Sequence, residues 1–326
     1  MKAIVITAPG GPEVLAVRDL PDPVPGPGEV LIRVRAFGLN HADAYMRSGA
    51  WGKVAQVPGI ECAGTVAADP GGRLAEGTPV VAILGGMGRT RNGSYAELVT
   101  VPASNVIPVR TSMAWTSLVA IPEVYGTAWS ALFGIMDLRP GQTVLVRGAT
   151  SALGQAAVNI AAGAGLTVLA SSRRADRAGL LEKLGAAIVL TDGGRLADEV
   201  AGRGLAVDGV LDVVGNAVLR DSLRAVRPRG RVCQVGFLGG LAAVDGFDPI
   251  ADLPSGVQLS FFGSAFVLGT ADFPLSAVPL QDMVARAEAG RYQAEPSRVF
   301  GFGELAEAHR IMEAGTAGGK MVAAVE

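Results

Sequence analysis

The sequence predicts an α/β protein in which a doubly wound parallel sheet is joined to a second, mostly β domain. Two patterns predict this class. Between about residues 143 and 265, six short apolar runs alternate with helical patterns, whereas the first third of the chain holds short β-branched runs separated by glycine and proline. The length of 326 residues suits about two domains, and 49% of the residues are hydrophobic, enough for a substantial core.

Strand patterns dominate the first third. The segment EVLIRVRAFGL, residues 29–39, follows a Pro-Gly turn signal, and GTPVVAIL and SYAELVTV are further strand candidates on either side of the loop 85–93. The N-terminal MKAIVITAPGG has the pattern of a strand followed by a turn. Several short strands with turn residues between them indicate a compact β domain.

The middle of the chain has the alternation of a parallel sheet. Its six apolar runs are TVLVR, LTVLAS, AIVL, GVLDVV, RVCQVGF and QLSFFGSA. After the first run, five residues share one face at helical spacing: Leu153, Ala156, Ala157, Ile160 and Ala164. A second helix is predicted over 176–184, with Gly185 as a suitable residue after its end. Such alternation favours an open parallel sheet with right-handed crossovers.

The tail from Phe266 on breaks this rhythm. The segment GELAEAHRIMEAG, residues 303–315, predicts one amphipathic helix, and KMVAAVE predicts a final strand. The pattern therefore changes near Leu138 and again near Phe266, and each change is a candidate domain boundary.

Composition argues against several classes of function. Charged residues make up 18% of the chain and the formal net charge is −2, so no concentrated basic surface for nucleic acid is expected. No run of about 18 uninterrupted apolar residues occurs, and the N-terminus lacks the pattern of a secretory leader. Two cysteines, Cys62 and Cys233, cannot make a disulfide framework. We therefore expect a cytoplasmic protein that binds neither nucleic acid nor membranes.

The junction VLVRGATSALGQAAVNIA places a turn between a predicted strand and a predicted helix. Unpaired N–H groups and the positive end of a helix dipole bind phosphate at such a junction. Two glycines of the G-x-G-x-x-G fingerprint are missing, because its positions hold Ala149, Ser151 and Gly154. A plain helix start capped by Thr150 or Ser151 is the alternative. The context favours a dinucleotide site made by Ala149, Thr150, Ser151, Ala152, Leu153 and Gly154.

The end of the second predicted strand bears on which dinucleotide fits. Sites that prefer NAD place Asp or Glu there to bind the ribose 2′-hydroxyl. This chain has Ser171 and Ser172, followed by Arg173, Arg174 and Arg177. Guanidinium groups bind a 2′-phosphate bidentately, whereas a carboxylate would repel it. A solvated basic helix start is the alternative, although positive charge is unfavourable there. We therefore expect NADPH as the cofactor.

Five segments, in this order, resemble the zinc-independent quinone oxidoreductases of the medium-chain dehydrogenase/reductase superfamily. They are GLNHADAYMRSG, VPGIECAGTV, NGSYAELVTVP, EVYGTAWSAL and VLVRGATSALGQAAVNIA. The resemblance covers essentially the whole chain, including RPRGRVCQVGFLGG and AGGKMV. It implies a GroES-like catalytic domain over 1–122, a Rossmann domain over 123–265, and a C-terminal segment, 266–326, that returns to the first domain. The catalytic cleft is then expected between the two domains.

The same resemblance bears on metals. Zinc-dependent relatives have a Cys at the position of Asn40 and a His at that of Ile60, and the residues here are poor or impossible zinc ligands. The four-cysteine loop of a structural zinc site is missing as well. The remaining candidates show no zinc-ligand spacing; they are His41, Glu61, Cys62, Cys233 and His309. We therefore expect no metal.

Without a metal, reduction of an electron-poor acceptor is the easier chemistry, because the developing charge delocalises over the acceptor. Asn40 and Tyr45 match the family stretch N-x-x-D-x-Y-x-x-x-G and are expected to donate hydrogen bonds to the acceptor oxygen. In related enoyl reductases, a tyrosine in this segment is associated with proton donation or substrate orientation. The alternative is that Asn40 caps a turn and Tyr45 packs on the core. Asp43 is expected to bind local backbone N–H groups.

The resemblance implies further cofactor contacts. Thr127 is expected beside the nicotinamide, and Lys320 of GGKMV near the cofactor cleft. The other contacts follow later strands and are Val214, Gly215, Asn216, Gly236, Phe237, Phe266, Val267 and Leu268. Many relatives have a tyrosine after the third strand that helps to bind the 2′-phosphate. Here the segment is VLTD, so Arg173 and Arg177 are expected to carry more of that role.

These expectations converge on a zinc-free, NADPH-dependent reductase of quinones or α,β-unsaturated carbonyls. A 2-enoyl thioester reductase is the alternative enzyme, with Arg89 and Arg91 as anchors for coenzyme A. A non-catalytic, NADPH-binding regulatory protein is the alternative outside enzymes. The apolar segment VQLSFFGSAFVLG suits edge-to-edge pairing of strands, so a homodimer is expected.

Overall fold

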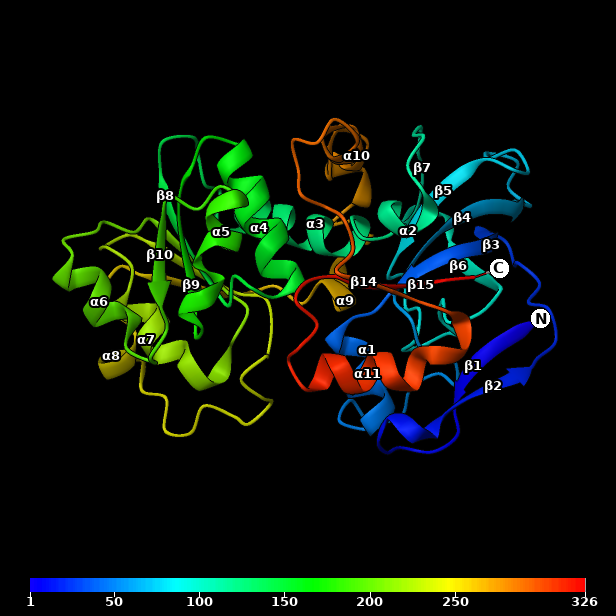
Figure 1. Ribbon diagram of the computed structural model, residues 1–326, viewed down its shortest axis with the longest axis horizontal. Coiled ribbons are helices and arrows are strands. Elements are labelled where there is room, and N and C mark those ends of the chain that lie inside the picture. Colours follow the sequence, from blue (N-terminus) through cyan, green and yellow to red (C-terminus); the bar gives the residue numbers. More distant parts are fainter. Residues whose placement is uncertain (326) are drawn as a thin grey trace. The chain divides into compact units, whose positions relative to one another are not determined.

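The computed structural model describes residues 1–325, which divide into two compact units (Figure 1). Unit 1 holds Met1–Glu123, Ala265–Ala289 and the chain from Ala294 on, and unit 2 holds Val124–Ser264 and Gly290–Gln293. The long segment of unit 2 begins one residue after the start expected for the Rossmann domain, residue 123. It ends one residue before the expected end, residue 265. The sequence assigns Gly290–Gln293 to the C-terminal segment, whereas the structure places these residues in unit 2.

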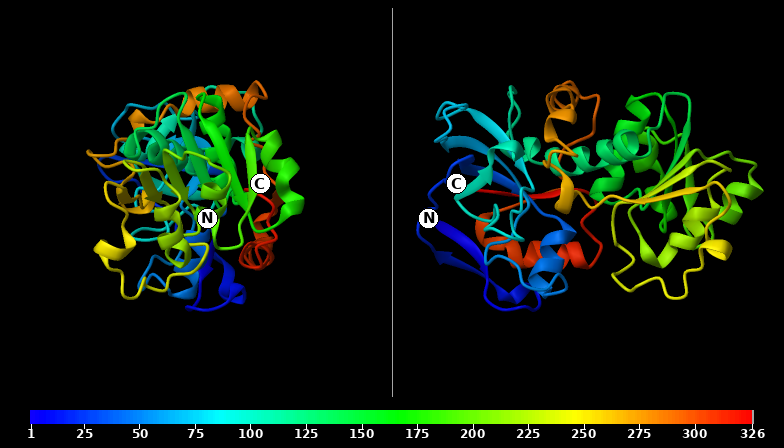
Figure 2. Two further views of the ribbon diagram at one scale, coloured as in Figure 1. Left: turned by 90° about the vertical axis from the view of Figure 1, so that its left-hand side faces the viewer. Right: turned by 180° about the vertical axis from the view of Figure 1, so that it is seen from behind.

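Unit 2 is built on a six-stranded parallel sheet (Figure 2). The strand order is β10-β9-β8-β11-β12-β13, and every neighbouring pair is parallel. The strands are β8 (Thr143–Arg147), β9 (Thr167–Ser172), β10 (Ile188–Thr191), β11 (Gly209–Asp212), β12 (Arg231–Gln234) and β13 (Gln258–Phe261). This order confirms the predicted doubly wound, Rossmann-type sheet.

Helices cover the sheet because its strands are apolar on both faces. Val144, Leu145 and Val146 of β8 are all 0% exposed, as in parallel sheets packed on two sides. The connecting helices are α4 (Ala152–Gly163), α5 (Ala178–Lys183), α6 (Leu196–Gly202), α7 (Leu219–Arg224) and α8 (Pro249–Asp252). The 3-10 turns η4 (Ala175–Arg177) and η5 (Asn216–Val218) precede α5 and α7, and α3 (Pro122–Trp129) continues as a π-helical stretch, η3 (Ser130–Ile135).

Two predicted strands of unit 2 are shorter than the runs that predicted them. In GVLDVV the strand ends at Asp212, because the Asp212 carboxylate accepts the N–H groups of Val214 and Gly215, both at 2.8 Å, and so holds a turn. In QLSFFGSA the strand ends at Phe261, and helix α9 (Ser264–Val267) begins within the same apolar run. Hydrophobicity alone did not mark either end.

Unit 1 contains a seven-stranded, mostly antiparallel sheet and a separate antiparallel pair, β1–β2. The sheet order is β14-β15-β3-β4-β5-β7, with β6 also paired to β3. The strands are β1 (Lys2–Ile6), β2 (Leu15–Asp19), β3 (Glu29–Gly38), β4 (Glu61–Ala68), β5 (Pro79–Ile83), β6 (Leu98–Pro102), β7 (Val106–Pro108), β14 (Arg298–Phe300) and β15 (Met321–Ala324).

The helices of unit 1 are short. They are α1 (His41–Ser48), α2 (Trp115–Leu118), α10 (Leu280–Glu288), α11 (Leu305–Glu313) and most of α9, with 3-10 turns η1 (Pro12–Val14), η2 (Ala103–Asn105), η6 (Leu275–Ala277) and η7 (Phe302–Glu304). Helix α11 and strand β15 lie where the sequence predicts an amphipathic helix and a final strand. The strand predicted over SYAELVTV begins only at Leu98, because Tyr95 and Ala96 bond instead to β1, with Ile4 donating to the Tyr95 carbonyl at 2.8 Å.

The pairing of β15 with β3 brings residues near 320 beside residues near 40. These strands are antiparallel, with Val322 opposite Gly38, and the N–H of Leu39 donates to the carbonyl of Met321 at 3.0 Å. Lys320, which precedes β15, therefore lies beside Asn40, which follows β3. This register positions the polar cluster described below.

Two further features bear on expectations about partners. Among the described residues, one helical stretch, Trp115–Ile135, is long and apolar enough to cross a membrane, but 78% of its apolar 18-residue window is buried in the protein, as in a core helix. Strand β13 ends the order of its sheet, and its Leu259 and Phe261 are 38% and 54% exposed. Edge-to-edge pairing of two copies there stays a prediction.

Candidate functional site

A tight turn joins β8 to α4 in unit 2. Gly148 has a φ of +80°, a conformation that L-residues rarely adopt, so a glycine begins the turn one position before the fingerprint. Ser151 caps the helix: its Oγ accepts the N–H of Gly154 at 3.0 Å and donates to the Gly148 carbonyl at 2.8 Å. A Cβ on Gly154 would lie 2.4 Å from that carbonyl oxygen. Close packing of α4 on the turn therefore requires glycine at 154.

The turn, which we call the glycine turn (Gly148–Gly154), has the donors for a phosphate. The N–H groups of Ala152 and Leu153 open α4, a 12-residue helix, where no preceding turn can accept their hydrogens and where the helix dipole is positive. The N–H of Ala149 donates to the carbonyl of Ser171 at 3.1 Å, and the carbonyl of Thr150 accepts from the Gln155 side chain at 2.9 Å. Ser151 is thus a cap, as in the alternative interpretation, without closing the phosphate site.

The glycine turn lies at the topological switch point of the sheet. From β8 the chain winds outward to β9 and β10 on one side and to β11, β12 and β13 on the other, and ligands bind beyond the carboxyl ends of strands at such a point. Gly215 and Gly236 follow β11 and β12 there. A Cβ on Gly215 would lie 2.3 Å from the Gly236 carbonyl oxygen, so these two backbones touch.

Other predicted contacts at this edge are engaged by the protein. The Asn216 side chain donates to the Ala242 carbonyl at 2.7 Å and accepts from the Gln234 amide at 2.9 Å. The Phe237 ring packs on Phe261, with ring centroids 5.6 Å apart. Val214 lies in the turn that Asp212 holds.

The segment Ser171–Arg177, here called the basic segment, holds the last two residues of β9 and the residues that follow this strand. Ser171 and Ser172 are buried, and the Ser172 hydroxyl accepts the N–H of Arg174 at 3.0 Å, which fixes the start of the loop. Arg174 is paired with Asp176, whose carboxylate accepts from Nε at 3.0 Å. Within the part of the chain that the structure describes, the guanidinium groups of Arg173 and Arg177 make no hydrogen bond and no ion pair within 4.0 Å, although the Arg177 charge helps to lower the pKa of Asp176. These two arginines are therefore the ones available for an anion.

In unit 1, three side chains form a buried polar cluster. The Lys320 ammonium donates to Oδ1 of Asn40 at 2.6 Å, to the Leu39 carbonyl at 3.2 Å, and to Oε1 of Glu61. Nδ2 of Asn40 donates to the same Glu61 oxygen at 3.0 Å. Lys320 is 5% and Glu61 0% exposed. All three ammonium hydrogens are thus used within the protein, and the Asn40 amide is held in one orientation.

Asp43 anchors the start of α1 below that cluster. Its carboxylate accepts the N–H of Asn40 at 2.9 Å, the N–H of Gly59 at 3.1 Å and the hydroxyl of Tyr95 at 3.2 Å. This is the local backbone role expected from the sequence. Full burial raises the pKa of Asp43 to about 7, although these hydrogen bonds and the Lys320 charge oppose the rise.

Through Tyr95, Asp43 is connected to His309 in helix α11. The Tyr95 oxygen lies 3.1 Å from Nε2 of His309, which is buried and whose pKa is lowered to about 3 by burial and by the nearby Arg47 charge. Arg47, 1% exposed, forms an ion pair with Glu313, one helical turn beyond His309. A single polar network therefore ties α1 to α11.

Aromatic rings continue outward from α1 in a row, here called the aromatic row: His41, Tyr45, Trp51 and Phe266. Successive ring centroids are 6.5, 6.0 and 6.0 Å apart, with interplanar angles of 33°, 32° and 36°. Phe266 is 52% exposed, and the Arg89 guanidinium lies 4.9 Å from its ring centroid. Burial raises the pKa of the Tyr45 hydroxyl, which therefore stays protonated at neutral pH.

Comparisons with known proteins agree with this architecture. A family model described as "Alcohol dehydrogenase GroES-like domain" matches residues 26–111, and one described as "Zinc-binding dehydrogenase" matches residues 184–322. The quinone oxidoreductase of Mus musculus is 30% identical over 250 residues, which are 73% of this chain and 74% of the relative.

Solved structures match along the whole chain. A mycobacterial protein complexed with NADPH superimposes with a TM-score of 0.86 at 28% identity, and the match covers 100% of both chains. A structure described as an NAD-dependent alcohol dehydrogenase gives a TM-score of 0.83 at 28% identity, again over 100% of both chains. The chain belongs to the medium-chain dehydrogenase/reductase superfamily. The resemblance to quinone oxidoreductases is confirmed at this level.

The zinc implied by one matched family name does not fit the donors in this member of the superfamily. Ile60 is apolar and 4% exposed, and Oδ1 of Asn40 already accepts from the Lys320 ammonium, a cation that would repel a second one. Within residues 1–325, no three His, Cys, Asp or Glu side chains lie together in an arrangement that could hold a metal ion. Burial raises the pKa of the Cys62 thiol, which keeps it in its poorly ligating form.

The remaining predicted residues of this superfamily member are divided between the units. Thr127 lies in unit 2, 2% exposed within α3. Phe266, Val267 and Leu268 lie in unit 1, where the Leu268 carbonyl accepts from Asn105 at 3.2 Å. Contact of these residues with a cofactor stays a prediction.

Sequence reasoning missed the buried Arg147 at the end of β8. Its guanidinium is bidentate to Asp192, at 2.9 and 3.0 Å, and lies 2.8 Å from Asp221. It thereby ties the base of the glycine turn to α7 and to the end of β10. The available signal was a charged residue inside an apolar strand run, since a buried arginine requires carboxylate partners. The links among Asp43, Tyr95 and His309 gave no such signal, because they join distant segments.

Proposed function

We propose that this chain is a zinc-free, NADPH-dependent reductase that transfers hydride to a quinone or an α,β-unsaturated carbonyl compound. The observation that carries the proposal is the Asn40–Glu61–Lys320 cluster, which holds an internal ammonium and an oriented amide donor at the position where a zinc-dependent relative would need metal ligands. The NAD(P)-dependent oxidoreductase class itself rests on the superfamily membership.

Preference for NADPH is supported by the basic segment. Among the described residues Arg173 and Arg177 have no hydrogen-bond or ion-pair partner, and the end of β9 holds Ser171 and Ser172 rather than the carboxylate that binds a ribose 2′-hydroxyl. Arg174 contributes less to the proposal, because Asp176 holds its guanidinium. The pyrophosphate would lie on the N–H groups of Ala152 and Leu153 at the glycine turn. A related mycobacterial structure was solved with NADPH.

The reduced nicotinamide, when bound, supplies a hydride. The residues of this chain orient and polarise the acceptor. One hydrogen of the Asn40 amide goes to Glu61, so the other is left for an acceptor oxygen. Lys320 prevents the amide from flipping, because its ammonium can bond only to the oxygen end. The protonated Tyr45 hydroxyl, in the helix that Asn40 precedes, is the second proposed donor, and it can supply a proton as negative charge develops on the acceptor.

The aromatic row favours a flat acceptor. The π faces of Tyr45 and Trp51 carry partial negative charge, which attracts electron-poor rings such as those of quinones, while Arg89 covers Phe266 at the end of the row. A quinone stacked beside Tyr45 would keep its carbonyl oxygen near the donors of α1. The row therefore supports quinones over purely aliphatic acceptors.

The test is a screen of NADPH oxidation against quinones, enones and enoyl thioesters, with NADH run in parallel. The proposal expects turnover with quinones or enones, a clear preference for NADPH, substoichiometric zinc by elemental analysis, and no effect of chelators. Tight NADPH binding with no turnover on any acceptor would favour the non-catalytic alternative. Turnover confined to crotonyl-coenzyme A would favour the thioester alternative.

The thioester alternative expected Arg89 and Arg91 to bind coenzyme A, but both side chains have partners within the protein. Arg91 forms an ion pair with Glu29 at 2.6 Å, and Arg89 covers Phe266 while donating to the Ala265 carbonyl at 3.2 Å. Neither guanidinium is free to hold the phosphates of coenzyme A. We therefore keep quinone and enone reduction as the single proposed function.

A further inference from the structure

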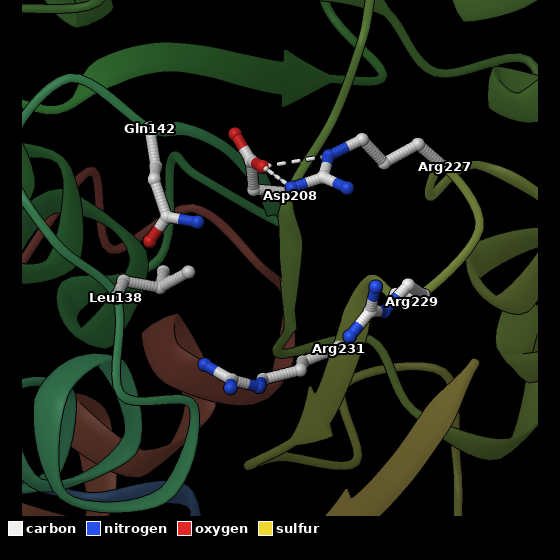
Figure 3. A pocket seen from close by; sticks show the side chains of 6 residues that line it. All are labelled: Leu138, Gln142, Asp208, Arg227, Arg229 and Arg231. Atoms are coloured by element: carbon white, nitrogen blue, oxygen red, sulfur yellow. Dashed lines mark hydrogen bonds and ion pairs between the residues drawn. The ribbon is translucent and has the colours of Figure 1, made fainter. Parts of the chain in front are cut away.

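A pocket of about 280 Å³ opens at the edge of the unit 2 sheet opposite to the glycine turn (Figure 3). Its lining residues are Leu138, Gln142, Asp208, Arg227, Arg229 and Arg231. They flank the amino ends of β8, β11 and β12, whereas the glycine turn follows the carboxyl end of β8. The five residues of β8 span about 16 Å, so the pocket is separate from the site described above.

The pocket is basic. Three arginines face one aspartate, which leaves a net charge of two positive units on its lining. Asp208 is engaged by Arg227, whose Nε donates to it at 2.7 Å, and by the N–H of Thr143 at 2.7 Å. Arg231 donates to the carbonyls of Met136 and Asp137 and is thereby held across the pocket floor. The contacts of Arg227 and Arg231 leave the charge of Arg229 without a counter-charge in the pocket lining.

Arg229 is the third arginine of the lining, and its backbone is strained. Figure 3 shows its side chain directed into the pocket, between those of Arg227 and Arg231. Within residues 1–325 its guanidinium has no hydrogen-bond or ion-pair partner. Its φ is +68°, in the left-handed region that favours glycine. A long cationic side chain at a position suited to glycine costs conformational energy, and such strain marks places where the side chain has a role.

We propose that this pocket, here called the arginine pocket, binds a small dianion such as a phosphate group or a dicarboxylate. Guanidinium groups bind both anions bidentately. The volume suits a ligand smaller than the usual drug-sized occupant of protein pockets. The lining has one apolar side chain, Leu138, so an aromatic or lipid ligand has little to pack against. This inference is independent of the proposed catalytic function.

The site is tested by calorimetric titration with two probes, inorganic phosphate and succinate, which distinguish the two sources of dianion. The titrations use the Arg173→Ala/Arg177→Ala protein, so that the unpaired arginines of the basic segment cannot compete for anions. We expect saturable binding of at least one probe. Changing Arg229→Gly should weaken that binding at least tenfold.

The Arg229→Gly change also separates binding from folding. Glycine relieves the left-handed φ, so the melting temperature without anion should stay unchanged or rise. Arg195→Gly is the matched control, because Arg195 is 83% exposed in the same unit and does not line the pocket; its affinity should stay within twofold. The proposal is overturned if neither probe saturates the parent protein, or if Arg229→Gly and Arg195→Gly weaken binding equally.

Discussion

The ammonium nitrogen of Lys320 lies 2.6 Å from Oδ1 of Asn40, and this ammonium and Nδ2 of Asn40 donate to the same carboxylate oxygen of Glu61. The contact fixes which end of the Asn40 amide carries hydrogens. It also places a positive charge beside the proposed donor without exposing it, since Lys320 is 5% exposed.

Removing that ammonium should damage both stability and turnover. Lys320→Met leaves Glu61 charged and buried, which should lower the unfolding free energy by about 3–5 kcal/mol in denaturant titrations. Lys320→Met combined with Glu61→Gln should recover most of the stability but not the turnover number, because the Asn40 amide is then free to flip. Recovery of both would show that Lys320 does not orient Asn40.

Tyr45→Phe should lower the turnover number by about 100-fold if the hydroxyl donates in the transition state. The Michaelis constant for NADPH should change little, because the hydroxyl is assigned to the acceptor. Steady-state kinetics with a quinone measures both. An unchanged turnover number would show that Tyr45 does not donate to the acceptor and only packs between His41 and Trp51.

The unpaired arginines of the basic segment should set cofactor preference. Arg173→Ala combined with Arg177→Ala should raise the Michaelis constant for NADPH by about tenfold or more while leaving that for NADH nearly unchanged. Arg174→Ala is the control, because Asp176 already engages that side chain. Equal effects on NADPH and NADH would refute the 2′-phosphate role.

The aromatic row should favour fused-ring acceptors. Trp51→Leu removes one ring, and loss of a stacking contact of about 1 kcal/mol should raise the Michaelis constant for phenanthrenequinone by about fivefold. The value for a small aliphatic enone should stay within twofold. Trp115→Leu is the matched control, since Trp115 is also partly exposed in unit 1 but lies outside the row. A rise for both acceptors would contradict selection by stacking.

The buried His309 should make stability fall in acid. Its pKa is about 3 in the folded protein, below the ordinary value of 6.5, so only the unfolded state binds a proton between these values. Asp43 acts oppositely, because its raised pKa of about 7 makes the folded state bind the proton and gain stability as pH falls towards 4.

These two contributions offset each other in the wild-type protein between about pH 4 and 6. His309→Gln removes one of them. Relative to wild type, the variant should gain about 1.4 kcal/mol of unfolding free energy for each pH unit lowered in that range. Denaturant titrations at pH 6, 5 and 4 measure the difference. Parallel pH profiles would mean that His309 is protonated in the folded state.

The sequence by itself determined the fold class. Continuous apolar runs predict strands that are buried on both faces, as in a parallel sheet. Gly154 holds the last position of the dinucleotide fingerprint, and Gly185 marks the end of a helix. It also located Asn40, Tyr45 and the arginines of the basic segment, because these residues lie in short contiguous motifs. The two strand ends in GVLDVV and QLSFFGSA were misplaced, since a side-chain hydrogen bond or a helix start, rather than polarity, ends each strand.

Only the tertiary structure decided what these residues contact. Lys320 is 280 positions from Asn40 along the chain, and the register of β15 on β3 makes them neighbours. The same holds for His309 with Tyr95 and for Phe266 with Trp51. The position of Asp176 in the structure also distinguishes the three arginines of the basic segment. Its carboxylate accepts from Arg174 and from neither Arg173 nor Arg177. Pairings across such separations depend on sheet register and helix packing, which the linear order of residues does not encode locally.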